Sequence, residues 1–341
     1  MQANVARKSS FSYLRIAASA AVVLLHTCST LLDNPDMFFL SAQEKLFFTG
    51  VKNMMAWAVP CFFMLSGALL LDKNKEITIR DCLCKYSKRI LLALIVFGMP
   101  FSFLIDFFNA RRLSLSMISN AFLNLLTDNS FAHLWYLYAL IGLYLLLPAL
   151  KLFLRHCSAE LLRYVLTLLF LFSFIIPDIN RIFGLNIAFT LPGSSYYLFY
   201  FLLGYFLTYE KPLWMYRSVW CSAGIVGFCF AVCAASANQH IWANVPYDCS
   251  ITAVGSLCIF SLFGKRSNVS TTKLWETDRC CFGVYLIHPL FIHFFYKALK
   301  ITPLGDLFFL KTPLFAAVFI VLSFAAAGLM RKIPPLRKHI L

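Results

Sequence analysis

Long apolar runs recur along the whole chain, separated by short polar stretches. A helix needs roughly 20 mostly apolar residues to cross a bilayer, and about ten runs approach that length. The pattern therefore predicts an all-α, polytopic integral membrane bundle of about ten transmembrane helices. The expected spans are residues 11–32, 49–71, 88–108, 134–154, 160–177, 195–209, 216–236, 247–264, 280–299 and 309–331.

Two of these runs, the fifth and the sixth, are short. Residues 160–177 and 195–209 are predicted to be tilted or interrupted helices. Residues 178–194, which contain a Pro-Gly pair, are predicted to form a loop or a partly re-entrant segment. No soluble domain, long linker or obvious repeat remains outside the runs, so we expect a single membrane domain over residues 1–341.

Composition agrees with a membrane protein. The 341 residues are 60% hydrophobic and 13% charged, and the mean hydropathy is +0.75. Soluble domains are nearer half apolar and a quarter charged. The first apolar run lacks a small-residue cleavage site and exceeds signal-peptide length, so we interpret it as a membrane span.

The net charge of +15 reflects an excess of Lys and Arg, and the positions of these residues along the chain suggest why they are there. With the N-terminus inside, about 21 of the 30 Lys and Arg residues fall on the inside and about 8 on the outside, which is the bias of the positive-inside rule. Both termini are therefore expected to be cytoplasmic, and nucleic acid is not an expected partner. Most of the 12 Cys lie in apolar runs, so neither a disulfide framework nor a zinc site is expected.

The first apolar run carries a polar stripe. Arg15 and His26 are 11 residues apart, which is three helical turns with about 20° left over and a rise of about 16 Å. Arg15, Ser19, Val22 and His26 therefore share one face. Ionisable groups in a membrane are costly and usually face a bundle interior or a water cavity. Position alone leaves two interpretations open: a functional cavity in which His26 is a base, or a snorkelling Arg15 and a packing His26.

Four stretches together resemble the acyltransferase type 3 family of membrane O-acyltransferases, in particular its short members that O-acetylate polysaccharides. They are the Arg and His separated by ten residues on the first helix, VPCFFMLSG at 59–67, HLWYL at 133–137 and FGVYLIHPL at 282–290. The chain departs from the family where Ile follows Arg15 instead of the usual Gly. The segment KYSKR at 85–89 also replaces the Arg-x-x-Arg of some members.

The resemblance implies a multi-pass O-acetyltransferase of the bacterial cytoplasmic (inner) membrane. Its co-substrate would be acetyl-CoA or another acyl-CoA, with no bound cofactor and no metal. The acceptor would be a hydroxyl of a cell-surface or lipid-linked polysaccharide, such as an exopolysaccharide. Partners would be this glycan or glycolipid, membrane lipid and envelope-biosynthesis proteins. Without an appended extracellular hydrolase-like domain, the membrane unit would meet the acceptor itself or act with a partner.

The resemblance also implies roles for single residues. His26 would deprotonate the acceptor hydroxyl or carry the acyl group covalently. Arg15 would bind the donor or stabilise negative charge. The basic loop at 73–89 suits the phosphates of CoA, although a plain positive-inside loop explains it as well. The expected donor-binding residues are Arg80, Lys85, Lys88, Arg89 and Ser66, the last beside a Gly that also permits close helix packing.

A further group is expected to line the cavity or bind the acceptor: Ser19, His133, Trp135, Tyr285 and His288. Tyr285 and His288 share a helix face, but a structural histidine is equally compatible with the pattern. Trp135 is also explained as an interfacial belt residue. Asp106 has two candidate partners, His26 and Arg111, and the sequence favours neither.

Two other functions fit a polytopic bundle. A transporter or flippase for a lipid-linked glycan or small solute would also bury charges, but transporters commonly show paired half-repeats, which this sequence lacks. A structural scaffold gives no reason for a costly buried Arg and His. An acyltransferase is therefore the expected function, with the transporter as the alternative.

Overall fold

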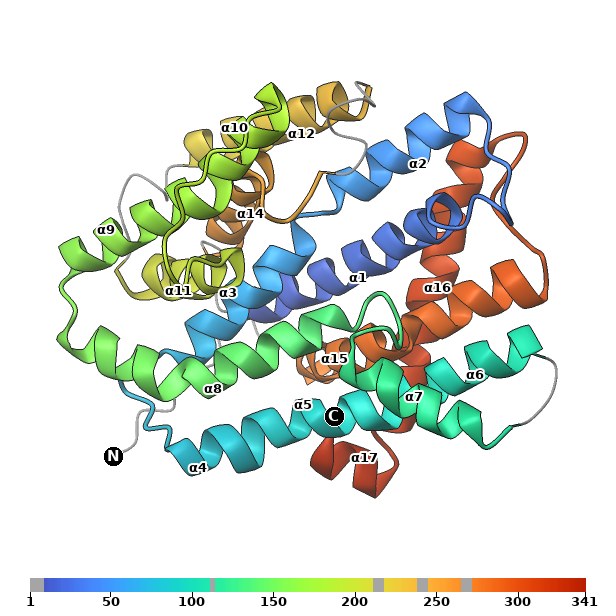
Figure 1. The fold of residues 1–341 in the computed structure, drawn as a ribbon, viewed down its shortest axis with the longest axis horizontal. Coiled ribbons are helices and arrows are strands. Elements are labelled where there is room, and N and C mark those ends of the chain that lie inside the picture. Colours follow the sequence, from blue (N-terminus) through green and yellow to red (C-terminus); the bar gives the residue numbers. More distant parts are fainter. Residues whose placement is uncertain (1–8, 111–113, 211–217, 238–244, 265–271) are drawn as a thin grey trace. The chain divides into compact units, whose positions relative to one another are not determined.

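Helices form all the regular structure in the part of the chain that the structure describes. The structure is a computed structural model and describes residues 9–110, 114–210, 218–237, 245–264 and 272–341 (Figure 1). The expected all-α fold is confirmed. The α-helices are α1 (Ser9–Leu32), α2 (Ala42–Met54), α3 (Ala58–Leu70), α4 (Ile79–Asp81), α5 (Lys88–Ala93), α6 (Met99–Ala110), α7 (Ser116–Leu126), α8 (Trp135–His156), α9 (Ala159–Phe170), α10 (Ile176–Phe183), α11 (Tyr196–Tyr209), α12 (Ser218–Ala237), α14 (Ser250–Phe263), α15 (Thr272–His293), α16 (Phe308–Met330) and α17 (Pro334–His339).

Of the four π-helical segments in the described residues, the first three join consecutive helices and the fourth extends the end of α15. They are η1 (Cys82–Ser87), η2 (Leu94–Gly98), η3 (Leu171–Ile175) and η5 (Phe294–Ala298). The chain divides into two compact units. The first unit is Met1–Leu69 with Ser158–Gly328, and the second is Leu70–Cys157 with Leu329–Leu341.

Eight helical stretches in the described residues are long and apolar enough to cross a membrane, the second of them with a short turn between α2 and α3. Of the ten expected spans, residues 195–209 and 247–264 correspond to the shorter helices α11 and α14, each of 14 residues. The polytopic bundle is confirmed, whereas the count of ten and the cytoplasmic side of the termini stay predictions. The eight stretches are Ser10–Leu32, Ala42–Leu70, Ile79–Leu104, Trp135–His156, Ala159–Phe183, Val219–Ala237, Thr272–Ala298 and Phe308–Met330.

The fifth span is longer than the sequence suggested. The helix continues from Ala159 through η3 to Phe183, a stretch of 25 residues. Pro177 falls in the first turn of α10, where its missing N–H is tolerated. Gly184 ends the helix in the left-handed conformation, with φ of 64°. The prediction of a loop over 178–194 was therefore wrong for residues 178–183 and confirmed for the rest.

The second span is broken and closely packed. α2 ends at Met54 and α3 begins at Ala58, so Pro60 lies in the first turn of α3 rather than inside a kinked helix. Further along α3, a Cβ added to Gly67 would collide with the carbonyl oxygen of Phe201, on α11. A Cβ added to Gly204, on α11, would collide with the backbone of α3 in the same way. The close helix approach expected at Gly67 is confirmed.

Helix α1 lies inside the first unit, packed against α2, α14 and α15 (Figure 1). Leu14, Ala18, Val23, Cys28 and Leu31 are fully buried and lie on different faces of the helix. Tyr13 is exposed and Arg15 and His26 are partly buried, so α1 is largely but not wholly enclosed by the first unit.

Candidate active site

Two polar pairs join α1 to α15 within the first unit. Arg15 forms an ion pair with Asp278, and the ring of His26 lies beside the ring of His288. The second pair is 11 residues further along α1 and ten residues further along α15. Because both numbers increase together, the two helices run parallel. We call these four residues, with Ser19 and Tyr285, the α1–α15 seam.

The ion pair neutralises the charge that Arg15 brings into the bundle. The Arg15 side chain is 17% exposed and that of Asp278 only 1%. Arg15 Nη1 donates to Asp278 Oδ1, and Ser19 Oγ donates to the backbone oxygen of Arg15 over 2.9 Å. Arg15 is thus fixed to a neighbouring helix instead of extending only to an interface.

Asp278 was missed by sequence reasoning. It lies among Lys273, Glu276 and Arg279, a stretch that looks like a charged cytoplasmic loop. The structure begins α15 at Thr272, so Asp278 is already in its second turn. The spacing of buried positions along α15, with Asp278 four residues after Leu274 and three before Cys281, is the signal that would have placed it on the helix face.

The two histidines form the other end of the seam. Their ring centroids are 5.1 Å apart, with an interplanar angle of 44°. His288 is fully buried, and its Nδ1 lies 3.0 Å from the Val284 oxygen and 2.9 Å from the Tyr285 oxygen. Two carbonyl acceptors at Nδ1 mean that this nitrogen carries the hydrogen of a neutral ring, so the lone pair is on Nε2. His288 is therefore held in one tautomer beside His26.

His26 itself is only partly buried, in contrast to His288. Ser29 Oγ lies 3.4 Å from His26 Nδ1, a long contact for a hydrogen bond. Tyr285 is also partly buried; its ring lies 6.3 Å from that of His288 and stacks on Phe282 at 6.4 Å. The seam thus gathers five of the residues expected from the sequence, Arg15, Ser19, His26, Tyr285 and His288.

The two residues expected from the middle motif belong to the second unit. His133 is 2% exposed and packs edge-on against Phe131, with ring centroids 5.2 Å apart, and near Phe101 at 6.5 Å. Trp135 begins α8 and packs edge-on against the ring of Tyr136. Their role with the acceptor stays a prediction. Asp106 lies on α6, and Arg111 lies outside the described residues.

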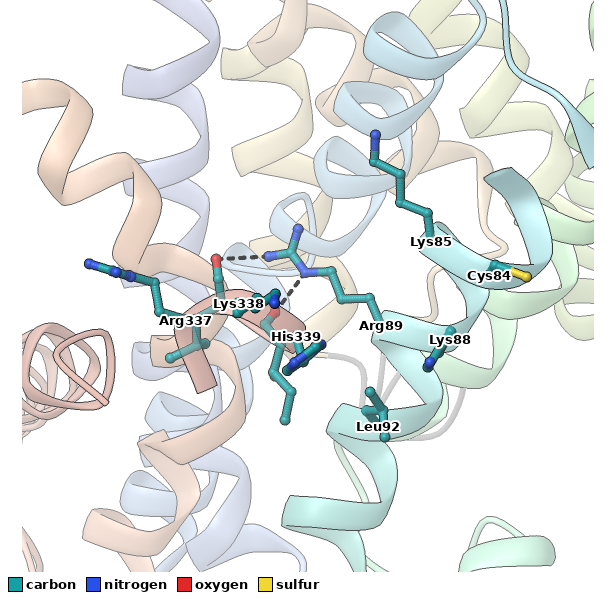
Figure 2. Close-up of a pocket in the computed structure, with 10 residues that line it drawn as sticks. Cys84, Lys85, Lys88, Arg89, Leu92, Arg337, Lys338 and His339 are labelled. Atoms are coloured by element: carbon teal, nitrogen blue, oxygen red, sulfur yellow. Dashed lines mark hydrogen bonds between the residues drawn. The ribbon is translucent and has the colours of Figure 1, made fainter. Parts of the chain in front are cut away.

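Three of the expected donor residues line one cavity. Lys85, Lys88 and Arg89 line a hollow of about 310 Å³ in the second unit together with the end of α17 (Figure 2). Arg80 is exposed on α4 and is not among the lining residues. Ser66, in the first unit, donates to the Phe62 oxygen of its own helix over 2.9 Å. The donor-binding roles of all five residues stay predictions.

The comparison with known families now bears on this arrangement. A family model described as an acyltransferase domain matches residues 8–332, nearly the whole chain. The chain belongs to the acyltransferase type 3 family. This acyltransferase matched no curated protein and no solved structure in the searches made.

Family membership confirms the resemblance inferred from the four motifs. The match includes both units, and with them the α1–α15 seam and most of the second unit. It favours a membrane acyltransferase over the transporter alternative. Both eight and ten crossings would make α1 and α15 parallel, as observed, because α15 is then the seventh or the ninth span, an even number of crossings after α1.

Proposed function

We propose that this acyltransferase moves an acyl group, in particular acetyl, from cytoplasmic acyl-CoA to a hydroxyl of a cell-surface or lipid-linked polysaccharide. The observation that carries the proposal is the His26–His288 pair, with ring centroids 5.1 Å apart, on the helix interface that also holds Arg15. A partly buried imidazole enclosed by helices is a suitable general base at neutral pH.

The chemistry needs one proton to move. His26 takes the proton of the acceptor hydroxyl as its oxygen attacks the thioester carbonyl of the donor. The new C–O bond forms and the C–S bond breaks, and the proton held by His26 passes to the departing thiolate of CoA. His288, whose Nδ1 hydrogen is directed at two backbone oxygens, orients the neighbouring ring. A covalent acyl-His26 intermediate is the variant of this scheme in which His26 attacks first.

Arg15 has a supporting place in this scheme. About three helical turns, or roughly 16 Å, separate it from His26 along α1. A guanidinium is always charged in a protein and this one is held by Asp278, and a fixed cation stabilises negative charge on a donor that extends along the seam. Lys85, Lys88 and Arg89 are our candidates for the donor phosphates, with Arg80 and Ser66 as further contacts. Tyr285, His133 and Trp135 are our candidates for the acceptor.

The test is transfer of labelled acetyl groups by the His26→Ala variant. Full-length protein in native membranes receives radiolabelled acetyl-CoA, and label in the glycan fraction is measured. General acid–base catalysis contributes about 10²–10⁴-fold, so we expect a loss of that size. His156→Ala is the matched control, because His156 is exposed at the end of α8. Wild-type transfer by His26→Ala, with the variant inserted normally, would falsify the proposal.

A further inference from the structure

A basic cavity in the second unit is built from two segments that are far apart in the sequence. One wall comes from η1 and α5 and the other from α17 and the residues after it (Figure 2). The volume is about 310 Å³, at the lower end of the range for ligand pockets. Its lining consists of Cys84, Lys85, Lys88, Arg89, Leu92, Arg337, Lys338, His339, Ile340 and Leu341.

The lining is strongly one-sided in charge. Five of the ten residues are Lys or Arg and a sixth is His, and none of the ten has a carboxylate side chain. The positive-inside rule explains why each segment is basic. It does not explain why two basic segments about 250 residues apart line one hollow. Exposed like charges repel only weakly through solvent, and an anion bound between them would turn that repulsion into attraction.

Arg89 holds the two walls together. Its Nε donates to the Ile340 oxygen over 2.6 Å, and its Nη2 donates to the Leu341 oxygen over 3.0 Å (Figure 2). These bonds use two of the five N–H donors of the guanidinium. Ile340 is 3% exposed, so the residue after α17 is anchored by burial as well. Arg337 and Lys338 therefore lie on a helix whose end is fixed, and both line the cavity, although the Arg337 guanidinium is directed away from Arg89 in Figure 2.

We propose that this cavity binds a phosphate group, and that Arg337 and Lys338 of α17 supply part of the positive charge that holds it. Arg and Lys are the side chains best suited to phosphate. A hollow of this size fits a phosphorylated portion of a ligand rather than a whole acyl-CoA. The phosphate belongs either to CoA or to the head group of an anionic lipid. The first source rests on the proposed function, and the second is independent of it.

The experiment measures binding without transfer. Full-length protein is placed in nanodiscs of phosphatidylcholine, and the Kd of CoA and of dephospho-CoA is measured by calorimetry. The Arg337→Ala/Lys338→Ala variant is compared with Arg331→Ala/Lys332→Ala, which removes the same charge from the turn before α17, outside the cavity. We expect a CoA Kd raised about tenfold in the first variant and changed less than twofold in the second.

Two further arms separate the sources of the phosphate. If Arg337→Ala/Lys338→Ala leaves the CoA Kd unchanged but loses phosphatidylglycerol that wild-type protein retains in native mass spectrometry, the cavity is a lipid head-group site and the phosphate proposal holds. If CoA and phosphatidylglycerol both bind as in wild type, with an unchanged melting temperature, the proposal is overturned. Intact CoA binding without any acetyl transfer would sink the proposed function alone.

Discussion

The α1–α15 seam and the basic cavity place charge in opposite ways. In the seam, Arg15 is paired with an almost fully buried Asp278, and His26 lies beside a buried His288. In the cavity, the basic side chains are exposed to solvent and none of the lining residues is acidic. A reacting group needs fixed geometry in a dry environment, whereas capture of an anion needs charge that solvent and ligand can reach.

This difference sets what each region responds to. A buried ion pair is screened little by salt, and removal of one partner leaves an uncompensated charge in a low dielectric. Exposed charges are screened within about 10 Å at 0.1 M salt. We therefore expect substitutions in the seam to act on stability and rate, and ionic strength to act on the cavity.

The largest expected effect comes from breaking the ion pair. Asp278→Asn keeps the shape of the side chain but leaves the Arg15 charge without its carboxylate. Removal of one partner of a buried pair costs about 3–5 kcal/mol, and we expect about 3 kcal/mol here because Arg15 is partly exposed. Thermal unfolding of the detergent-solubilised protein measures the change.

Glu276→Gln on the same helix is the control for that variant. Glu276 pairs with Arg279 over 3.1 Å, with both side chains more than half exposed. Exposed pairs contribute about 0–1 kcal/mol. Equal destabilisation by the two substitutions would contradict the assignment of Arg15–Asp278 as a buried pair. An Arg15→Gln/Asp278→Asn double variant that recovers part of the loss would support it.

The second effect separates a structural from a chemical role of His288. His288→Asn retains an N–H donor at the position of Nδ1 for the Val284 and Tyr285 oxygens, but it has no atom at Nε2. In the proposed scheme His26 becomes charged when it takes the acceptor's proton, and Nε2 of His288 is the atom that could accept a hydrogen bond from it. A hydrogen bond to a charged group contributes about 1.5–3 kcal/mol. We therefore expect kcat for acyl transfer to fall about 10- to 100-fold, with an unchanged melting temperature and donor KM.

His288→Gln is the companion variant, because its amide nitrogen reaches toward the Nε2 position instead. A wild-type rate for His288→Asn would show that His288 has only a structural role. A lower melting temperature for His288→Gln than for His288→Asn would show that the backbone hydrogen bonds hold the ring. The two readouts together locate the function of His288 at one nitrogen or the other.

The sequence predicted five of the six seam residues, Tyr285 and His288 among them through the resemblance. Helical periodicity placed Arg15, Ser19 and His26 on one face, and all three lie on the α1–α15 seam in the structure. It did not identify Asp278, because an acid among Lys273 and Arg279 lowers local hydropathy and resembles a loop. Which helices pack together is a tertiary property that periodicity does not contain.

The same limit applies to the cavity and to the fifth span. Lys85, Lys88 and Arg89 were expected to act together because they are close in sequence, whereas their convergence with Arg337 and Lys338 depends on the fold. The fifth span was expected to end near residue 177 because residues 178–194 contain a Pro-Gly pair, which indicates a loop. The π-helical η3 carries the helix into α10, where Pro177 falls in a tolerant first turn.

The smallest expected effect uses salt to separate the two regions in one assay. Raising NaCl from 0.05 to 0.5 M shortens the Debye length to a few Å, so it weakens contacts between the basic cavity and a phosphate. Each exposed contact contributes about 0.2–1 kcal/mol, and we expect the donor KM to rise about two- to fivefold. The value of kcat should stay within about twofold, because Arg15 and Asp278 are screened by protein.

Arg337→Ala/Lys338→Ala should flatten the response of KM, and Arg331→Ala/Lys332→Ala should leave it unchanged. A kcat that fell with salt while KM stayed constant would contradict this contrast. It would show that salt reaches the charges of the seam and does not affect binding at the cavity.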